Sequence, residues 1–368
     1  MSVLRLGVIF GGRSGEHEIS VMSACSVMAA AKQAGFQVVA IGVTRQGQWV
    51  YLRDGEAFLE AGHPEVAPEM GPSCFLLPDP DKKGVWVNGG GTMFLVEIDA
   101  VFPVLHGPYG EDGTLQGLLE LSGIPYVGAP VLASAVCMDK YTTKRILASH
   151  GVPHVPAIPV ERYAWRTKRE EVLANLLERV SYPLFAKPSG SGSSLGVTKV
   201  KSPDALAGAL DEAFLYDTRA LVEPAMEGCL EVECSVLGNE EPVASIAGQI
   251  LPRREFYDYE AKYLEDTTEL AIPARLDPEM MEMVRELAVQ AFLVTGCKGM
   301  ARVDFFVDLK ARKAYVNELN TIPGFTRVSM YPKMWEASGL SFPELVKRLV
   351  DLALERQTQS WREVYRRT

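Results

Sequence analysis

Two stretches of the sequence combine residue types that suit phosphate and metal chemistry. The first, KPSGSGSSLG at 187–196, places glycines and serines directly after Lys187. A Walker A loop carries its lysine after the last glycine, so this stretch does not match it. The glycines at 190, 192 and 196 also miss the GxGxxG spacing of a dinucleotide-binding loop. Both familiar phosphate loops are therefore excluded.

The residues on either side of this glycine loop predict a hairpin. YPLFAKPSG at 182–190 is typical of a strand that runs into the loop, and GVTKV at 196–200 is typical of the returning strand. A glycine turn of this kind can act as a lid over phosphates, with its backbone N–H groups pointing inward. A flexible linker between two strands is the alternative.

The second stretch, GMARVDFFVDLKARKAYVNELNTIPG at 299–324, predicts a metal site. Alternate side chains of a strand share one face. A hairpin centred on Ala311 therefore places Asp304 opposite Glu318 and near Asn320. Facing carboxylates repel each other, and a bound divalent cation would remove the conflict. Two carboxylates and one amide suit Mg²⁺ better than zinc; a solvated hairpin face is the alternative.

Near the start of the chain, the segment FGGRSGEHEIS at 10–20 could bind both the carboxylate and the ammonium group of an amino acid. The N-terminus of the helix that follows the glycines favours an anion, whereas Glu16 favours an ammonium group. His106, in LHGPYGEDG, follows a strand at the sheet edge where ligands gather. A functional and a structural role both fit this histidine.

Composition limits the class of protein. A chain of 368 residues suggests two or three α/β domains. The net charge of -10 argues against a nucleic-acid partner, and six cysteines without a CxxC motif indicate a reducing cytoplasm rather than a disulfide or zinc scaffold. The longest apolar stretch, 121–138, is interrupted by glycine and proline, so we expect a soluble protein with no membrane partner.

The hydrophobic pattern predicts a parallel βαβ unit, followed by a surface excursion and further alternating elements. His17 is expected to be exposed at the start of the first helix, and His63 to be solvated in the excursion. The predicted elements are a strand at 4–10, a helix at 17–35, a strand at 36–44, a surface excursion at 55–95, a strand at 99–107, a helix at 114–123, a short strand at 124–128 and a helix at 138–151.

Together these motifs resemble the D-alanine:D-alanine ligases of the ATP-grasp superfamily, over residues 1 to about 350. The segments that carry the resemblance are FGGRSGEHEIS, LHGPYGEDGTLQGLLELSGIPYVG, SAVCMDK, AKPSGSGSSLGV, FYDYEAKYLED, GCKGMARVDFF and VNELNTIPGFTRVSMYP. The resemblance implies a three-domain ATP-grasp fold with an N-terminal Rossmann-like parallel-sheet domain. The domains would be 1–137 for substrate binding, 138–224 with the glycine-rich lid, and 225–368 with the metal site and a mobile loop.

The resemblance also implies an activity, which is the ATP-dependent ligation of two D-alanine molecules. A D-alanyl phosphate intermediate would form, and D-alanyl-D-alanine, ADP and phosphate would be released for peptidoglycan synthesis. We expect a cytoplasmic homodimer that uses ATP and two Mg²⁺ ions, with Mn²⁺ as a substitute and a monovalent cation as a further candidate.

For the nucleotide and metal, the resemblance assigns residues by motif position. Lys140, Lys187, Ser193, Ser194 and Lys262 would contact the nucleotide and its phosphates, Glu223 and Met226 the adenine, and Glu231 the ribose, while Asp304, Glu318 and Asn320 would hold the metal ions.

For the amino acids, the resemblance places Glu16 at the first ammonium group, together with Ser193 and with Tyr263 of the YEAKY loop. His106 would lie beside this first substrate. The remaining residues would surround the reacting carbonyl and the acceptor: Arg302 and the backbone of Gly324 as the oxyanion hole, and Ser329 with Lys262 near the acceptor carboxylate and the transferred phosphate.

Other functions remain as alternatives at this point. Relatives that use D-lactate carry a histidine where this chain has Tyr263, so tyrosine favours an amine acceptor. Val328 replaces a histidine that some relatives have before Ser329. A glutathione-synthetase-like ligase and a nucleotide-binding regulator are the rivals. The YEAKY loop and the GEHEIS motif argue against the first, and the second is opposed by the intact Glu16, Arg302, Asp304, Glu318 and Asn320. A nicotinamide dehydrogenase would need fingerprint glycines that the chain lacks.

Overall fold

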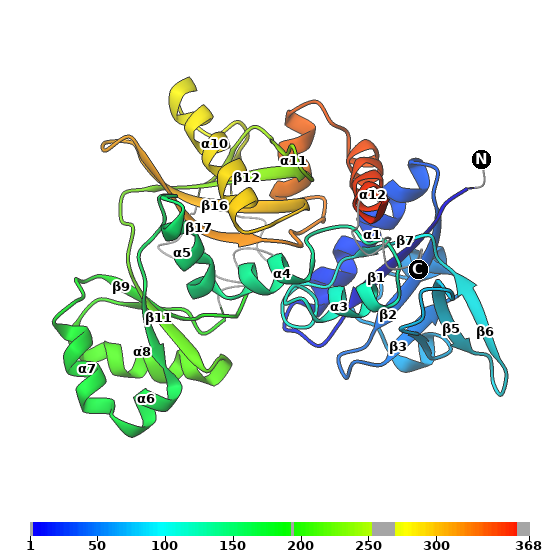
Figure 1. Cartoon of the computed structure of the whole chain (residues 1–368), viewed down its shortest axis with the longest axis horizontal. Helices are drawn as coiled ribbons and strands as arrows, with labels where there is room; N and C mark the ends of the chain where they lie inside the picture. Colours follow the sequence, from blue (N-terminus) through cyan, green and yellow to red (C-terminus); the bar gives the residue numbers. More distant parts are fainter. Residues whose placement is uncertain (1–2, 193–194, 252–268, 359–368) are drawn as a thin grey trace, which may run out of the picture.

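The computed structural model describes residues 3–192, 195–251 and 269–358 (Figure 1). Three groups of elements follow one another along the chain. The N-terminal group lies on the right of Figure 1, the central group at the lower left, and the C-terminal group above and between them. The red helix α12 (Phe342–Thr358) returns to the N-terminal group.

The N-terminal sheet contains the predicted βαβ unit. Its strand order is β3-β2-β1-β7, and β1 pairs in parallel with both β2 and β7. The helix between β1 and β2 ends before Gly35, whose φ of 89° is accessible to glycine without strain. The bounds are β1 Arg5–Gly11, α1 His17–Gln33, β2 Gln37–Val43, β3 Trp49–Leu52 and β7 Ala100–Pro103.

The surface excursion predicted at 55–95 contains regular structure that its weak periodicity did not indicate. The segment forms an antiparallel sheet of β4, β5 and β6, in which Leu76, Val85 and Val87 are buried against the N-terminal sheet. Its strands are too short to give a clear sequence period among the turn residues. The elements here are α2 Gly55–Glu60, the 3₁₀ helix η1 Pro68–Met70, β4 Cys74–Leu76, β5 Gly84–Asn88 and β6 Met93–Glu97.

The predicted strand at 124–128 is wrong, since only a single bridge joins Tyr126 to Val101. Three helices then lead to the central sheet: α3 Thr114–Leu121, α4 Val131–Met138 and α5 Lys140–Ser149.

The central sheet has the order β10-β9-β11-β8, and all its pairings are antiparallel. Strands β9 and β10 flank the glycine loop, with Thr198 opposite Ala186, so the predicted hairpin is confirmed. The bounds are β8 Ile158–Glu161, α6 Arg162–Thr167, α7 Arg169–Leu177, β9 Leu184–Pro188, β10 Thr198–Val200, α8 Pro203–Tyr216 and β11 Arg219–Pro224.

The C-terminal sheet has the order β15-β14-β12-β16-β17, with β13 also paired to β12. Helix α10 packs on this sheet, and its N-cap Asp277 accepts a hydrogen bond from Met280 N. The bounds are β12 Leu230–Gly238, β13 Val243–Ala244, β14 Gly248–Leu251, β15 Glu269–Ala271, α10 Pro278–Val294, β16 Gly299–Asp308, β17 Lys313–Asn320 and α11 Met330–Ala337.

The hairpin of β16 and β17 contains a bulge that the sequence did not indicate. Asp304 pairs with Glu318 as predicted, but Phe305 pairs with Val316, which leaves Asn317 as the extra residue. The register centred on Ala311 is therefore correct at the carboxylates and wrong by one residue near the turn.

One hydrophobic core joins the two ends of the chain. Leu345 and Leu349 of α12 belong to the same buried cluster as Phe102 of β7 and Met300 of β16. The central sheet has a separate cluster of its own. The domain boundaries after residues 137 and 224 stay predictions. Within the described part of the chain, no helix is both long and apolar enough to span a bilayer.

We expect the substitution Leu349→Ala to destabilise the fold strongly, because it opens a cavity in a core shared by the N- and C-terminal groups. Leu349 is 0% exposed, and losses of this kind cost about 2–5 kcal/mol. The control Leu215→Ala alters a side chain that is 72% exposed, so its effect should stay within about 0.5 kcal/mol. Denaturant titration measures both, and similar small values for the two would contradict the shared core.

Candidate active site

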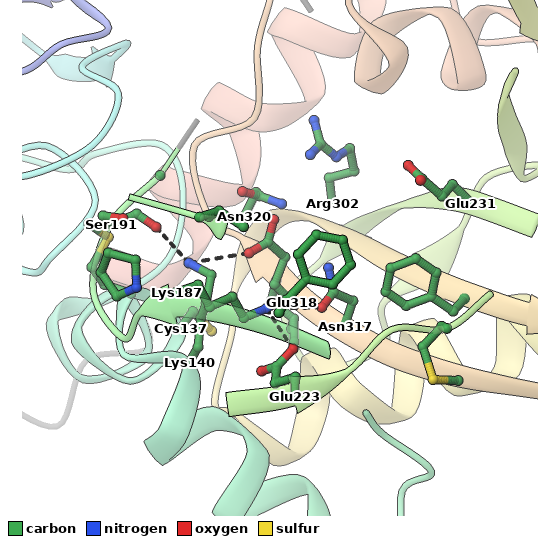
Figure 2. A pocket seen from close by; sticks show the side chains of 18 of the residues that line it. Cys137, Lys140, Lys187, Ser191, Glu223, Glu231, Arg302, Asn317, Glu318 and Asn320 are labelled. Atoms are coloured by element: carbon green, nitrogen blue, oxygen red, sulfur yellow. Dashed lines mark hydrogen bonds and ion pairs between the residues drawn. The ribbon is translucent and has the colours of Figure 1, made fainter. Parts of the chain in front are cut away.

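A cavity of about 380 Å³ lies where the three groups of elements meet, and Figure 2 shows part of its wall. This volume lies within the usual range for cofactor sites. The predicted residues that line it are Glu16, His106, Lys140, Lys187, Glu223, Met226, Glu231, Arg302, Glu318, Asn320 and Gly324. Asp304 bonds to two of these, and Ser329 lies against Gly324. Ser193, Ser194, Lys262 and Tyr263 lie outside the described residues.

Glu223 is held by two lysines at one end of the cavity. Its Oε2 lies 2.8 Å from Lys187 Nζ and its Oε1 lies 3.2 Å from Lys144 Nζ. Burial alone would raise the pKa of Glu223, but the two lysines outweigh it and hold the pKa below its ordinary value. Burial lowers the pKa of Lys144 to about 8. This end of the cavity therefore presents an ionised carboxylate fixed between two amines.

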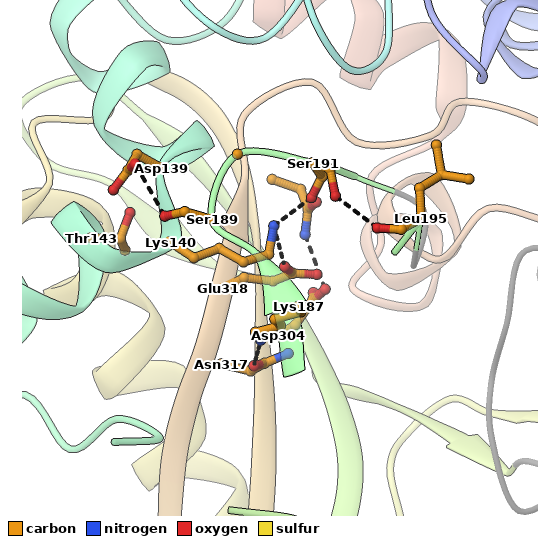
Figure 3. Close-up of polar contacts among 12 residues, drawn as sticks. Asp139, Lys140, Thr143, Lys187, Ser189, Ser191, Leu195, Asp304, Asn317 and Glu318 are labelled. Atoms are coloured by element: carbon orange, nitrogen blue, oxygen red, sulfur yellow. Dashed lines mark hydrogen bonds and ion pairs between the residues drawn. The ribbon is translucent and has the colours of Figure 1, made fainter. Parts of the chain in front are cut away.

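Lys140 connects helix α5, the glycine loop and β17, as Figure 3 shows. Its Nζ donates to Ser191 O at 2.7 Å and lies 3.3 Å from Glu318 Oε2. The N-cap of the same helix, Asp139, accepts from Thr142 N at 2.7 Å and from Ser189 Oγ at 3.0 Å. The glycine loop is thus bonded to the start of α5 through two residues, the charged Lys140 and the N-cap Asp139.

The carboxylate of Glu16 is enclosed by two glycines. A Cβ on Gly192 of the glycine loop would lie 3.0 Å from Glu16 Oε2, and one on Gly107 would lie 2.9 Å from it. Glu16 is only 8% exposed. At the base of the loop, Gly190 N donates to Asp217 Oδ2 at 2.7 Å, so this N–H does not take the inward direction expected of a phosphate nest.

Three carboxylates lie in one row across the C-terminal sheet. Glu233 pairs with Asp304, and Asp304 pairs with Glu318. Arg302 reduces the repulsion, because its Nε and Nη2 each lie 2.7 Å from an oxygen of Asp304 and its Nε lies 3.0 Å from Glu233 Oε2. Asn320 Nδ2 adds a 3.0 Å hydrogen bond to Asp304 Oδ2.

The bulge in β17 widens the polar face of this sheet. Regular alternation would place Asn317 and Glu318 on opposite faces, yet both line the cavity. Lys187 Nζ donates to Asn317 Oδ1 at 3.4 Å. A bulge is a common device for re-aiming a side chain beside a functional site.

The donor set of Asp304, Glu318 and Asn320 fits a hard divalent cation. All three offer oxygen ligands, which Mg²⁺ prefers. No group of three or more His, Cys, Asp or Glu residues is arranged as a metal site in the ranges that the structure covers. A metal would therefore depend on the amide of Asn320, and Arg302 would have to yield at least one oxygen of Asp304.

At the other end of the cavity, His106 and Glu111 bond to the same residue. His106 Nδ1 donates to Ile322 O at 3.0 Å, and Ile322 N donates to Glu111 Oε1 at 3.2 Å. Burial lowers the pKa of His106, so the ring is neutral although Glu16 opposes the shift. Loss of hydration, reinforced by Glu16, raises the pKa of Glu111 to about 8.

The expectation that His17 is exposed is wrong. The side chain is 0% exposed, its Nδ1 donates to Gly12 O at 2.9 Å, and its Nε2 accepts from Val66 N at 3.0 Å. His17 therefore fixes the glycine turn after β1 rather than facing solvent. His63 is exposed, as expected.

Known protein families and curated proteins match this sequence along nearly the whole chain. The family described as D-ala D-ala ligase N-terminus matches residues 5–129, and the family described as D-ala D-ala ligase C-terminus matches residues 146–351. A D-alanine–D-alanine ligase of Caldicellulosiruptor bescii is 45% identical over 98% of this chain and 97% of its own. The chain belongs to the D-alanine–D-alanine ligase family.

Solved structures of D-alanine ligases match the fold of this chain as well. The D-alanine–D-alanine ligase of Coxiella burnetii matches with a TM-score of 0.83 and 37% identity over 98% of both chains. The VanG D-Ala:D-Ser ligase of Enterococcus faecalis matches with a TM-score of 0.84 and 35% identity over 96% of this chain and 100% of its own. The predicted ATP-grasp fold class is confirmed by these members of the family.

Four residues of this family member's site were not predicted from sequence. Lys144 follows Lys140 by four positions on one helix, and this spacing could have indicated it. Glu233 alternates with Glu231 on a strand, which is a second usable signal. Glu111 stands in the GEDG segment of a recognised motif without an assigned role. Asn317 depends on the bulge, and no signal in the sequence marks it.

The raised pKa of Glu111 predicts a pH-dependent contribution to stability. Between its ordinary pKa of 4.5 and about 8, the folded protein binds more protons than the unfolded chain, so stability from this group falls as pH rises. The free energy of unfolding of the wild type minus that of Glu111→Gln should fall from pH 5 to pH 8, by at most about 1.4 kcal/mol per pH unit. Denaturant titrations at several pH values test this, and a constant difference would mean that the pKa is not raised.

Proposed function

We propose that this protein ligates two D-alanine molecules to D-alanyl-D-alanine with ATP, releasing ADP and phosphate for peptidoglycan synthesis. The observation that carries the proposal is the cavity itself. It joins a lysine-rich end, suited to a nucleotide, to an end lined by the carboxylate of Glu16 together with Arg302 and Gly324.

The nucleotide would lie between the central and C-terminal sheets. Lys140 and Lys187 would bind its phosphates, and the ionised Glu223 would accept a hydrogen bond from the adenine amino group, with Met226 beside the base and Glu231 at the ribose. Asp304, Glu318 and Asn320 would hold Mg²⁺, which neutralises phosphate charge when bound.

Activation of the first D-alanine explains the need for ATP. A carboxylate oxygen is a poor leaving group, so transfer of the D-alanyl group to an amine requires prior phosphorylation of that carboxylate. The carboxylate and the γ-phosphate are both anions, and the lysines offset their repulsion. Glu16 would hold the ammonium group of this substrate, with Ser193 and Tyr263 as its proposed partners and His106 beside it.

In the second step, the amine of the acceptor attacks the D-alanyl phosphate and phosphate leaves. The tetrahedral oxyanion would be bound by Arg302 and by the backbone N–H of Gly324. Loss of one such donor typically costs on the order of 10²-fold in rate. Ser329 and Lys262 would bind near the acceptor carboxylate and the transferred phosphate.

An acyl phosphate hydrolyses in water, so the site must exclude water while this intermediate is present. The approach of Gly192 to Glu16 supports a covering role for the glycine loop. We also propose two Mg²⁺ ions, with Mn²⁺ as a substitute and a monovalent cation as an activator. A cytoplasmic location, a homodimer and domain limits at 138 and 225 complete the proposal.

The choice of acceptor is the sharpest test of this function. With ATP, Mg²⁺ and D-alanine, we expect phosphate release that requires D-alanine and a product with the mass of D-alanyl-D-alanine. An equimolar amount of D-lactate or D-serine should leave that dipeptide as the main product. Because the similar VanG protein is a D-Ala:D-Ser ligase, mainly D-alanyl-D-serine would overturn the acceptor assignment, and phosphate release independent of any amino acid would overturn the ligase.

Glu16→Gln should weaken binding of the first D-alanine, since it removes the charge that pairs with the ammonium group. We expect the KM for D-alanine to rise about tenfold or more, in line with the 1.5–3 kcal/mol typical of hydrogen bonds to charged groups, while the KM for ATP stays within about twofold. Glu18→Gln is the control, because Glu18 lies on the same helix and pairs with Arg45. Equal effects of the two substitutions would count against the role of Glu16.

A further inference from the structure

The backbone of Ile322 is bonded on both sides by side chains from the N-terminal group. Its C=O accepts from His106 Nδ1 at 3.0 Å, and its N–H donates to Glu111 Oε1 at 3.2 Å. The other oxygen of Glu111 accepts from Gly107 N at 2.7 Å. Glu111 therefore links the loop after β7 directly to the loop after β17.

The same network continues to Phe325. Neutral His106 accepts at Nε2 from Ser23 Oγ at 3.2 Å, and Ser23 Oγ accepts from Phe325 N at 3.2 Å. Ser23 and Phe325 are both 0% exposed. The segment 322–325 is thus held at its first and last residues, and Gly324 lies between them.

A backbone N–H stabilises an oxyanion only when it is fixed before the charge develops. A displacement of about 1 Å can cost on the order of 10²-fold in rate. Gly324 has no side chain to anchor it, so its direction depends on its neighbours in the chain. The contacts at Ile322 and Phe325 supply that anchor.

We propose that Glu111 is a positioning residue that fixes the Gly324 amide in the oxyanion hole by binding the N–H groups of Gly107 and Ile322 together. The proposal rests on the ligase function proposed above. Glu111 acts through the backbone, because both of its oxygens accept hydrogen bonds from main-chain N–H groups.

The requirement is for two acceptors on one side chain. Glu111 supplies both as an ionised carboxylate, so the variants are compared at a pH above its pKa of about 8. A glutamine offers one acceptor oxygen and one donor amide. Glu111→Gln can therefore satisfy either Gly107 N or Ile322 N, and places a donor against the other. Glu111→Asp keeps two acceptors at a shorter reach.

The first measurement compares Glu111→Gln with Asp112→Asn. Asp112 accepts hydrogen bonds from Tyr109 N at 2.8 Å and from both the N–H, at 3.0 Å, and the hydroxyl of Thr114. Its substitution therefore perturbs the same segment through contacts that do not involve Ile322. We expect Glu111→Gln to lower kcat about 10- to 100-fold and the affinity for a phosphinate dipeptide, a mimic of the tetrahedral intermediate, by a similar factor. The affinity for ATP should change less than about twofold, and Glu111→Asp should restore part of the kcat.

The second measurement does not depend on activity. Amide hydrogen exchange of the peptide containing 321–326 should be about tenfold faster or more in Glu111→Gln, and unchanged in Asp112→Asn. If the Gln variant does not fold, Ser23→Ala serves in its place, because it releases Phe325 N from the same network; we expect faster exchange and a three- to tenfold lower kcat.

The outcomes separate the two proposals. Unchanged exchange at 321–326, or a kcat equal to that of Asp112→Asn, would overturn the positioning role even if the wild type makes D-alanyl-D-alanine. If exchange at 321–326 is faster in Glu111→Gln but the wild type forms no dipeptide, the positioning role of Glu111 is supported and the proposed ligase function is overturned.

Discussion

The crowding of like charges is the constraint on which the site depends. Glu233, Asp304 and Glu318 occupy one row of neighbouring strands, where facing carboxylates repel. Arg302 relieves the first pair and Lys140 relieves Glu318. The two cations that relieve this repulsion, Arg302 and Lys140, are also those proposed to bind the oxyanion and the phosphates.

These cations come from different parts of the chain. Lys140 begins α5, Lys187 lies on β9 and Arg302 lies on β16. A phosphate would compete with Glu318 and Glu223 for the two lysines, and a metal would compete with Arg302 for Asp304. Binding would therefore rearrange existing ion pairs. Because these side chains are already paired, the rearrangement would exchange one set of charged partners for another.

Patterns with a clear period and a distinctive composition were predictable from the sequence. The βαβ unit, the glycine hairpin and the pairing of Asp304 with Glu318 follow from local rules and are present. The small sheet within 55–95 was missed, because its short strands are interrupted by turn residues. The bulge at Asn317 was missed because nothing in the local sequence distinguishes it from continued alternation.

Residues whose role depends on distant partners were the hardest to predict. The burial of His17 follows from Val66, a residue in the segment taken for a surface excursion. Burial lowers the pKa of Lys144, and Glu223, which β11 brings beside it, opposes that shift. The family resemblance supplied Glu223 and His106, but neither resemblance nor spacing indicated which groups hold them.

The arrangement of the cores determines which parts of the site stay together. The N-terminal sheet and α12 share one cluster that also contains Met300, Ile322 and Phe325. Glu16, His106, Arg302 and the segment 322–325 are therefore attached to a common body. The central sheet has its own cluster and contributes Lys187 and the glycine loop. The proposed nucleotide end of the cavity therefore lies between two separate cores, whereas the proposed oxyanion hole and ammonium site lie against one shared core.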